Sequence, residues 1–288
     1  MRIALLYSEG AGNGVALTRI REALDAHGHQ LVCVVKKHPD APRLLDRPCD
    51  LVAAAGGDGT VSAAARAVVS TGVPLAILPL GTANNIARSL GVDGAVETLI
   101  ARWRDGRRQP VDLGVVRGSW GERRFIEAVG TGLVPSGIEA MQAARTAGKR
   151  PAGSKVADAL RKYRDLLAAL PPREGSVTTD GETAHGSYLM VEVLNTCAVG
   201  PNLRFSPEAT ASDGYLSVVT ATADQRDRLA GYLDEAAPAG DAGLPGRCAH
   251  TVEIRGWDRV HIDDQVLVWP PDEPVLVSVD PSALEVLV

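Results

Sequence analysis

Buried-strand and amphipathic-helix patterns alternate along the first hundred residues. Continuous apolar runs predict four buried strands, at residues 3–7, 31–35, 51–55 and 75–78. Between them, hydrophobic positions recur with helical spacing over residues 15–27, and residues 61–70 predict a second helix. Residues 39–45 predict a short helix or turn. This alternation predicts a parallel sheet covered by helices, which binds ligands at the carboxyl ends of its strands.

The pattern changes after about residue 109. Short segments rich in Val, Ile and Thr, separated by glycine or charged turns, are typical of an antiparallel sandwich. They cover residues 111–117, 124–128, 176–179, 188–194, 215–220, 251–255 and 260–262. One amphipathic helix, residues 155–170, interrupts them, and residues 236–246 predict a loop. We therefore expect an α/β fold with an N-terminal parallel-sheet domain and a C-terminal β-sandwich-like domain.

Two glycine-rich turns follow the third and fourth predicted strands. The first reads Gly56-Gly57-Asp58-Gly59-Thr60, followed by Val61 and Ser62, and the second reads Gly81-Thr82-Ala83-Asn84-Asn85. Both turns lie at one edge of the predicted sheet, so they can line a single polyphosphate site. There, glycine exposes main-chain N–H groups, and each following helix adds its positive end. The structural alternative is a pair of ordinary capped turns, with Thr60 capping one helix and Thr82 or Asn84 capping the other.

The first turn contains no lysine, so it is not a P-loop of the Gly-x-x-x-x-Gly-Lys type. Positive charge for a transferred phosphate must then come from magnesium, from helix ends or from basic residues elsewhere. Asp58, which we expect to be an exposed turn residue, is the natural residue to orient that metal ion or a water molecule on it. Thr82 and Asn84 can donate side-chain hydrogen bonds to phosphate or ribose.

Composition and charge limit the classes of binding partner that this chain is expected to have. The chain has 288 residues and a net charge of −5, which argues against nucleic acid as the main partner. Arginine clusters at residues 104–108 and 117–124 are either solvated or a patch for anionic lipid. The four cysteines lack metal-ligand spacing, and no secretory signal or membrane-spanning run is evident. We therefore expect a cytoplasmic protein with reduced thiols.

The two glycine motifs together, Gly-Gly-Asp-Gly-Thr at 56–60 and Pro-Leu-Gly-Thr-Ala-Asn at 79–84, resemble the signature of the diacylglycerol kinase catalytic-domain family, in its soluble bacterial lipid kinase branch. Sphingosine and ceramide kinases, and more distantly NAD kinases, are similar. Segments 127–138 and 195–219 resemble the opening and the lipid-side sheet of the family's second domain.

The resemblance implies a domain organisation. Residues 1–109, with a returning strand at 275–288, would form the nucleotide-binding α/β domain, and residues 110–274 the β-rich lipid or acceptor domain. The fold would be NAD kinase- and diacylglycerol kinase-like, and ATP would meet the lipid hydroxyl in a cleft between the domains.

The resemblance also implies roles for particular residues. ATP contacts are implied for Ser8, Gly12, Gly56, Gly57, Asp58, Gly59, Thr60, Val61, Ser62, Gly81, Thr82 and Asn84. A structural magnesium ion (Mg2+) is implied at Asp213, with the main-chain carbonyls of Thr210 and Tyr215. From the sequence alone, a plain Ser-Asp-Gly turn is the favoured interpretation there.

The chain departs from the family's pattern in three places. The first loop reads Ser8-Glu9-Gly10-Ala11-Gly12 in place of Asn-Pro-x-Ser/Ala-Gly, which brings the negative charge of Glu9 near a phosphate. Ser62-Ala63 stands where the family carries Asn-Glu, so a carboxylate is missing. Asp263-Asp264-Gln265 replaces Asp-Gly-Glu, whose acids the family uses to take the proton of the lipid hydroxyl.

The last departure bears on catalysis. Glutamine cannot act as a base, so the role of Gln265 falls on Asp263 or Asp264, or is lost. A loose phosphoryl-transfer transition state depends mostly on positioning and charge neutralisation, so we expect reduced or altered activity. An acidic surface turn is the structural alternative. His185, His250 and His261 lack ligand spacing, and we interpret them as satisfied surface or core histidines.

These observations predict a kinase that transfers the γ-phosphate of ATP to a lipid alcohol, with diacylglycerol as the default acceptor. The enzyme would visit the inner face of a membrane without inserting, and a homodimer is also left open. A kinase of a non-lipid alcohol fits the glycine turns equally well. A nucleotide-binding protein with weak or no catalysis is the third alternative, because of Gln265 and Ala63.

Overall fold

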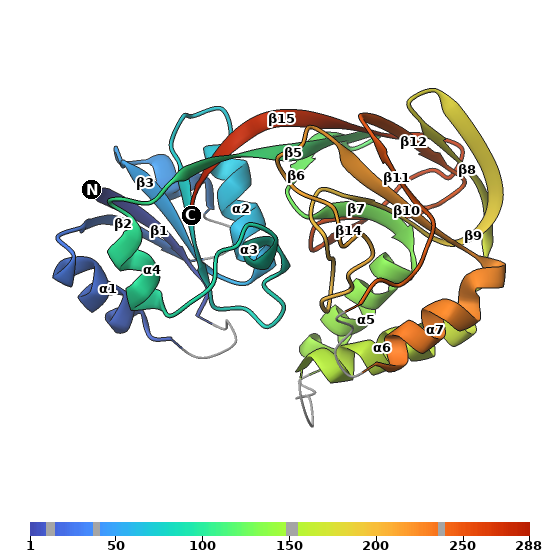
Figure 1. Ribbon diagram of the computed structural model, residues 1–288, viewed down its shortest axis with the longest axis horizontal. Coiled ribbons are helices and arrows are strands. Elements are labelled where there is room, and N and C mark those ends of the chain that lie inside the picture. The colour runs from blue at the N-terminus through green and yellow to red at the C-terminus, as the bar shows by residue number, and fades with distance from the viewer. Residues whose placement is uncertain (10–14, 37–40, 148–154, 236–239) are drawn as a thin grey trace. The chain divides into compact units, whose positions relative to one another are not determined.

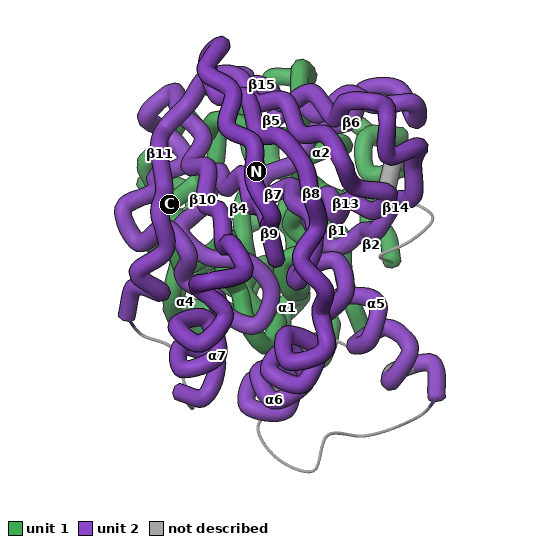
Figure 2. The backbone as a smooth tube through the Cα atoms, turned by 90° about the vertical axis from the view of Figure 1, so that its right-hand side faces the viewer, with its two compact units in different colours: residues 1–113, 281–288 green, residues 114–280 purple. Residues whose placement is uncertain are grey.

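The computed structural model describes residues 1–9, 15–36, 41–147, 155–235 and 240–288. The chain divides into two compact units (Figure 2). Unit 1 contains Met1–Leu113 and Pro281–Val288, and unit 2 contains Gly114–Asp280. The unit boundaries thus lie a few residues from those expected from the sequence.

Unit 1 is a parallel sheet with helices on both faces (Figure 1). Its elements are β1 (Arg2–Tyr7), α1 (Leu17–Ala26), β2 (Gln30–Lys36), a 3-10 helix (Ala41–Leu45), β3 (Leu51–Gly56), α2 (Asp58–Val68), β4 (Leu75–Pro79), α3 (Asn85–Ser89), α4 (Val96–Arg102) and the first half of β5 (Arg108–Gly118). The end of β15 (Val275–Leu287) completes the sheet in the order β15-β4-β3-β1-β2, with every neighbouring pair parallel. The predicted strands and the parallel fold are confirmed.

Burial explains why these segments form strands and helices. All six residues of β3 are buried, as expected for a strand covered on both faces. Helix α1 buries Ile20, Ala23 and Leu24 on one face, and Gly28 follows it with a φ of 66°, a conformation that glycine adopts without steric cost. Helix α2 begins at Asp58, three residues earlier than expected, because the glycine turn leads straight into it.

Unit 2 is built on an antiparallel sheet. Its elements are the second half of β5, β6 (Gly121–Phe125), β7 (Ala128–Gly132), α5 (Leu133–Thr146), α6 (Lys155–Ala169), β8 (Arg173–Thr179), β9 (Glu182–Leu194), β10 (Leu216–Thr222), a 3-10 helix (Ala223–Gln225), α7 (Arg226–Asp234), β11 (Gly246–Ala249), β12 (Thr251–Arg255), β13 (Arg259–Ile262), β14 (Gln265–Val268) and the start of β15. Strand order runs β14-β13-β7-β9-β8-β12-β15, and β10 pairs with β9 and β11.

The expectation of a single helix in this part of the chain is wrong. Helix α6 is present as predicted, but α5 and α7 pack against it. The start of α5 contains Pro135 and Gly137, two residue types of low helix propensity, so the sequence did not predict a helix there. Proline is nevertheless tolerated in the first turn of a helix. Helix α7 is only nine residues long and depends on packing more than on propensity.

The sheet of unit 2 separates two hydrophobic clusters. On one face, Met190 and Leu194 of β9 pack with Tyr163 and Leu167 of α6 and with helix α7. Alternate residues of the same strand point to the other face and pack with Trp257 and Trp269. Both tryptophans are buried and belong to the hydrophobic core of unit 2.

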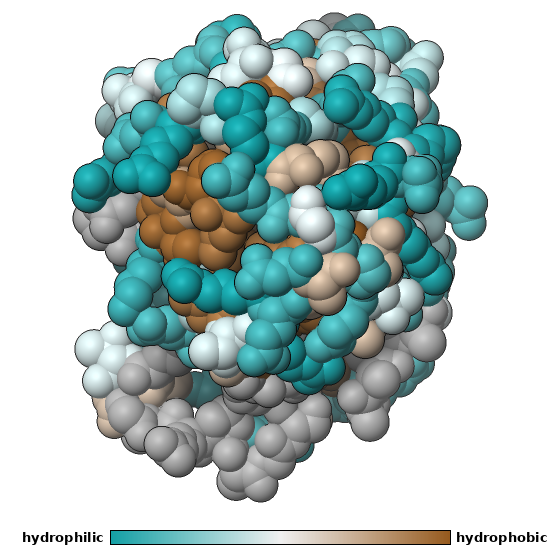
Figure 3. Space-filling model, turned by 90° about the vertical axis from the view of Figure 1, so that its left-hand side faces the viewer, coloured by the Kyte–Doolittle hydropathy of each residue, from teal (hydrophilic) through white to brown (hydrophobic). Residues whose placement is uncertain are grey.

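The face drawn in Figure 3 is mostly hydrophilic, with a hydrophobic area among its polar side chains. Among the described residues, the large hydrophobic side chains that are most exposed are Tyr215, Val268 and Leu276. No described helix is long and apolar enough to cross a membrane.

Candidate functional site

The two glycine turns touch each other through their backbones. Strands β3 and β4 are parallel neighbours, with Gly56 opposite Pro79, and Leu80 N–H donates to the Gly56 carbonyl at 2.9 Å. A Cβ atom added to Gly81 would lie 2.4 Å from the Gly57 Cα atom. Only glycine fits at such an approach. The expectation that both turns line one edge of the sheet is therefore confirmed.

Helix α2 begins next to this contact between Gly57 and Gly81. Gly57 is the N-cap residue, without a side-chain cap, and its carbonyl accepts the Thr60 and Val61 N–H groups. Thr60 lies inside the helix with 2% of its surface exposed, so its expected capping role is wrong. A helix of this length carries a partial positive charge at its first turn, where N–H groups lack intrahelical partners. The turn can therefore hold an anion through main-chain N–H groups.

Asp58 links the two turns. It is the first residue of α2 and is half-buried, not exposed as expected. Its Oδ1 atom accepts the Ile86 N–H at 3.0 Å, so the acid of the first turn binds the helix that follows the second turn. A hydrogen bond to a charged acceptor contributes about 2 kcal/mol. Its carboxylate is also an oxygen ligand of the type that magnesium prefers.

Asn84 holds the second turn from inside. Its backbone is left-handed, with a φ of 52°, and its Oδ1 atom accepts the Gly81 N–H at 2.8 Å. Its Nδ2 atom donates to the carbonyls of Gly81 at 3.1 Å and Pro79 at 3.3 Å. The geometry therefore gives the amide a structural role and does not support the expected donation to phosphate or ribose. Thr82, two residues before Asn84, is exposed.

The end of β1 joins the same edge of the sheet. Tyr7 pairs with Ala55 of β3, and Ser8 N–H donates to the Ala55 carbonyl at 3.0 Å. Gly12, for which an ATP contact was implied, lies outside the described residues. The charge of Glu9 is offset by Lys36, whose Nζ lies 2.7 Å from a Glu9 carboxylate oxygen. That ion pair raises the pKa of Lys36 through its hydrogen bond and the negative charge of Glu9.

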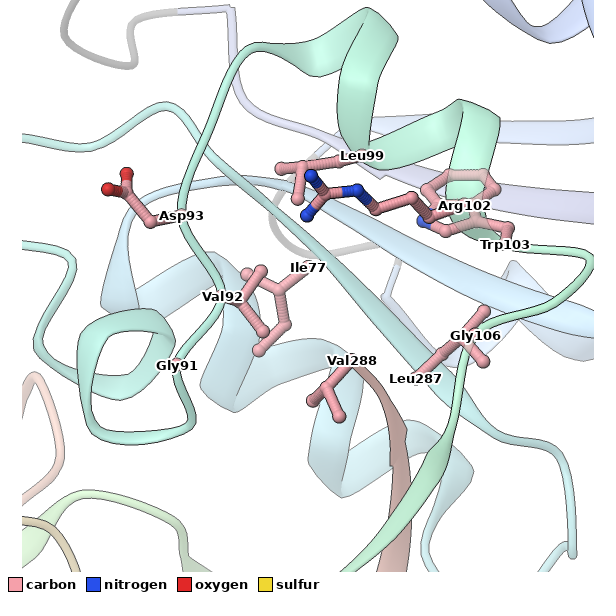
Figure 4. A pocket seen from close by; sticks show the side chains of 10 residues that line it. All are labelled: Ile77, Gly91, Val92, Asp93, Leu99, Arg102, Trp103, Gly106, Leu287 and Val288. Carbon is pink, nitrogen blue, oxygen red and sulfur yellow. The ribbon is translucent and has the colours of Figure 1, made fainter.

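Val61 and Ser62 point into the protein, with 2% and 1% of their surfaces exposed. Their side chains are therefore not available to a ligand in this conformation. A separate cavity of unit 1, between β4, α4 and the end of β15, is lined by Ile77, Val92 and Trp103 (Figure 4). It contains no residue of either glycine turn and is not the expected nucleotide site.

In unit 2, the predicted base Asp263 occupies the hairpin turn between β13 and β14. It is 2% exposed, so the alternative of an acidic surface turn is wrong for this residue. Its Oδ1 atom accepts the main-chain N–H groups of Glu127 at 2.9 Å and Ile126 at 3.3 Å, and its own N–H donates to the Ala128 carbonyl. Asp264 is half-buried next to it.

Gln265 faces a guanidinium group. Arg123 Nη1 donates to the Gln265 Oε1 atom at 3.1 Å. Within the described part of the chain, no carboxylate lies within ion-pair distance of Arg123, whereas the neighbouring Arg124 pairs with Glu122 and Asp280. A neutral amide thus stands where the family pattern has an acid, and an arginine holds its oxygen.

Of the buried groups that support this turn, only His261 was singled out from the sequence, as a satisfied surface or core histidine, and the structure shows it buried with a hydrogen-bond partner. Asn195 Nδ2 donates to the Ile126 carbonyl at 3.0 Å, and Asn195 N–H donates to the Glu127 carbonyl at 2.9 Å. His261 and Glu192 form a fully buried pair with 2.8 Å between Nε2 and Oε2. No sequence spacing reveals these contacts, because they join residues about 70 positions apart.

The expected magnesium loop is a closed turn. Asp213 Oδ1 accepts the Tyr215 N–H at 2.9 Å, and Asp213 Oδ2 accepts the Thr210 hydroxyl at 3.1 Å. The side chain of Asp213 is exposed. One carboxylate beside main-chain carbonyls fits the hard oxygen donors of magnesium, which keeps several water ligands. The donor chemistry therefore fits the ion, although hydrogen bonds within the turn explain the geometry equally well.

The architecture defines a class: a parallel-sheet unit with two glycine turns in contact at one sheet edge, followed by a helix-backed antiparallel unit. Residues 2–116 match the family model "Diacylglycerol kinase catalytic domain". Residues 132–288 match the model "YegS C-terminal NAD kinase beta sandwich-like domain". The chain therefore belongs to the diacylglycerol kinase family and is a kinase, an ATP:alcohol phosphotransferase.

Named relatives agree with this assignment. The chain is 25% identical to the diacylglycerol kinase of Bacillus subtilis, over 96% of this chain and 86% of that protein. It is 28% identical to a diacylglycerol kinase of Mycobacterium tuberculosis, over 79% and 75% of the two chains. The crystal structure of a diacylglycerol kinase from Bacillus anthracis superposes with a TM-score of 0.73 at 20% identity, covering 99% and 96% of the two chains, and shows the same fold.

Proposed function

We propose that this protein is an ATP-dependent lipid kinase that transfers the γ-phosphate to the hydroxyl of diacylglycerol. The observation that carries the proposal is the backbone contact between Gly57 and Gly81. Because the turns contain no lysine, we infer that main-chain N–H groups and the first turn of α2 bind the phosphates. The relatives of known name support diacylglycerol as the acceptor.

Unit 1 supplies the groups for the nucleotide. The glycine turns would hold the phosphates through N–H groups, and Ser8 would add a hydroxyl from the end of β1. Asp58 would hold magnesium while keeping its bond to Ile86 N–H. When bound, magnesium neutralises charge on the phosphates and so favours their transfer.

Unit 2 supplies the groups for the acceptor. Asp263 is the candidate to take the proton from the lipid hydroxyl, and its bonds to the N–H groups of Ile126 and Glu127 fix its direction. Positioning of this kind is the main demand of a loose transition state, in which proton removal contributes less. The membrane contact would be peripheral and at the inner face, where Tyr215 and Val268 are exposed apolar side chains that could meet lipid.

The function can be tested by incubating the purified protein with labelled ATP, magnesium and a panel of alcohols. The panel contains diacylglycerol in mixed micelles, other neutral lipid alcohols and soluble polyols. Transfer to diacylglycerol supports the proposal. Transfer to soluble alcohols alone would overturn the lipid assignment and support a kinase of a non-lipid alcohol.

A nucleotide-binding role without useful catalysis is the second candidate. It is favoured by Gln265, whose amide cannot accept a proton as a carboxylate does and whose oxygen is bound by Arg123. Calorimetry with ATP and magnesium, run beside the transfer assay, separates the two functions. Binding of ATP without transfer to any alcohol would replace the kinase proposal with this one.

A further inference from the structure

A buried histidine–carboxylate pair lies directly behind the Asp263 turn. His261 and Glu192 have no exposed side-chain surface, and they are joined at 2.8 Å between Nε2 and Oε2. The second ring nitrogen of His261, Nδ1, lies 3.0 Å from the main-chain carbonyl oxygen of Asp263. The imidazole therefore connects the interior of the sheet to the backbone of the predicted base.

A glycine in the strand between them makes the pair possible. Strand β7 lies between β13 and β9, and Gly130 of β7 pairs with His261 on one side and with Glu192 on the other. A Cβ atom at Gly130 would lie 2.3 Å from the Glu192 carboxylate. Because position 130 carries no side chain, the two side chains meet above it, on the sheet face covered by α5 and α6.

The hydrogen-bond geometry fixes where one proton resides. A carbonyl oxygen only accepts, so Nδ1 of His261 must carry a hydrogen to bond to Asp263. Nε2 then either donates to an ionised Glu192 or accepts from a protonated one. In both cases a proton is shared between His261 and Glu192, and the Nδ1–H bond to Asp263 is preserved.

The turn that the pair supports is strained and heavily restrained. Asp263 has a φ of 50°, which costs a residue other than glycine conformational energy and persists only where the surroundings enforce it. Its carboxylate is held by two N–H groups, and its carbonyl by His261. In addition, Gln142 of α5 donates to the Asp264 carbonyl at 3.2 Å.

We propose that His261 and Glu192 are positioning residues for phosphoryl transfer, which hold Asp263 in its catalytic direction through the Nδ1–H bond to its carbonyl. This inference rests on the proposed kinase function. Both side chains are fully buried, so they would act through Asp263 and not by contact with substrate. Glu192 keeps the ring oriented and protonated on Nδ1, and His261 transmits that orientation to the turn.

A matched pair of variants tests this role without leaving a buried charge unpaired. In the Glu192→Gln background, His261→Asn retains a donor near the position of Nδ1, whereas His261→Leu has a similar shape and no donor. We expect the Asn double variant to keep kcat within about threefold of the Glu192→Gln variant. The Leu double variant should lose kcat by about tenfold to a hundredfold at unchanged ATP dissociation constant, because the base is displaced.

Equal kcat values in the two double variants would overturn the proposal, since a purely structural role does not distinguish them when their melting temperatures match. A second measurement does not depend on activity. In wild-type protein with 15N-labelled histidine, Nδ1 of His261 should carry a proton that exchanges slowly with water, and the exposed His185 gives the fast-exchanging reference. An unprotonated Nδ1 would overturn the proposal even in an active enzyme. Absence of transfer by the wild type would contradict the proposed function alone, and the histidine spectrum would still decide whether His261 holds the turn.

Discussion

The two glycine turns of unit 1, residues 56–60 and 81–85 (the glycine edge), and the Asp263-Asp264-Gln265 turn of unit 2 (the acid turn) differ in how they expose polar groups. The glycine edge brings bare backbone together, with the Cα atom of Gly57 next to Gly81, so that N–H groups can face a charged ligand. The acid turn buries its charged groups, and Asp263, His261 and Glu192 each have a hydrogen-bond partner inside the protein. A site for a polyanion needs donors that reach the surface, whereas a site for one proton transfer needs a carboxylate in a fixed direction.

The largest effect should come from Asp58→Ala, because it removes the candidate metal ligand and the bond to Ile86 N–H. We expect phosphate transfer to be abolished with the fold intact by circular dichroism. Asp58→Asn is the matched variant, since it keeps an oxygen acceptor and removes only the charge. Full activity of Asp58→Ala would show that metal binding on unit 1 has been assigned to the wrong residue.

Gly81→Ala should break the glycine edge itself. The new methyl group would lie 2.4 Å from Gly57 Cα and 2.6 Å from Asn84 Oδ1, so the turns must separate. We expect ATP affinity, measured by calorimetry, to fall by about a hundredfold, equivalent to about 2.7 kcal/mol. Gly231→Ala on α7 is the control, because a Cβ atom there meets nothing within 4 Å. Unchanged ATP affinity in Gly81→Ala would mean that the nucleotide binds elsewhere.

Asp263→Asn probes the acid turn in the same way. Asparagine can still accept the N–H groups of Ile126 and Glu127 through its oxygen but cannot take a proton. We expect kcat to fall at least about tenfold, at the lower end of a general-base contribution, while ATP affinity is unchanged. An unchanged kcat would exclude Asp263 as the base and leave Asp264 to be tested.

Gln265→Glu should raise activity. The new carboxylate would lie beside Arg123, whose Nη1 is 3.1 Å from the present amide oxygen. We expect a gain in kcat of about tenfold if an acid at this position assists proton removal. Gln265→Leu, which lacks both charge and amide, is the control for packing. A fall in kcat with glutamate would indicate that the enzyme depends on an uncompensated Arg123.

The smallest predicted effect is on the pH dependence of stability. Burial raises the pKa of Glu192, and the nearby His261 opposes this effect. Burial lowers the pKa of His261, but the Glu192 carboxylate raises it, and the net shift of the His261 pKa is upward. Tyr163 and Glu127 lie in the same interior, and burial also raises the pKa of Tyr163. Unfolding therefore releases protons that the folded pair retains. The contribution of Glu192 is complete only below about pH 4.3 and that of His261 below about pH 6.5, and each is lost as the pH rises through the folded pKa of the group.

Melting temperatures measured from pH 6 to pH 10 check this prediction. The wild type should lose more thermal stability at alkaline pH than Glu192→Gln, in which the carboxyl group no longer titrates. Parallel curves for the two proteins would mean that the pair does not retain a proton on folding.

Sequence patterns predicted the parts of this protein that depend on local chemistry. Fully apolar runs such as β3 identify strands buried on both faces, and glycines at 56, 57 and 81 identify turns where backbone must approach backbone. Helices α5 and α7 were not predicted. Pro135 and Gly137 weaken the helical pattern of α5, and both helices are stabilised by packing against α6.

The sequence alone thus determined the parallel strands of unit 1, the two glycine turns and the family, because these follow from short-range patterns of hydrophobicity and backbone freedom. Tertiary structure alone decided that Asn84 braces its own turn, that Asp58 binds Ile86, and that His261 meets Glu192 above Gly130. Such partners are set by strand register and by the direction of each side chain across the sheet. Both are fixed only when the whole sheet assembles.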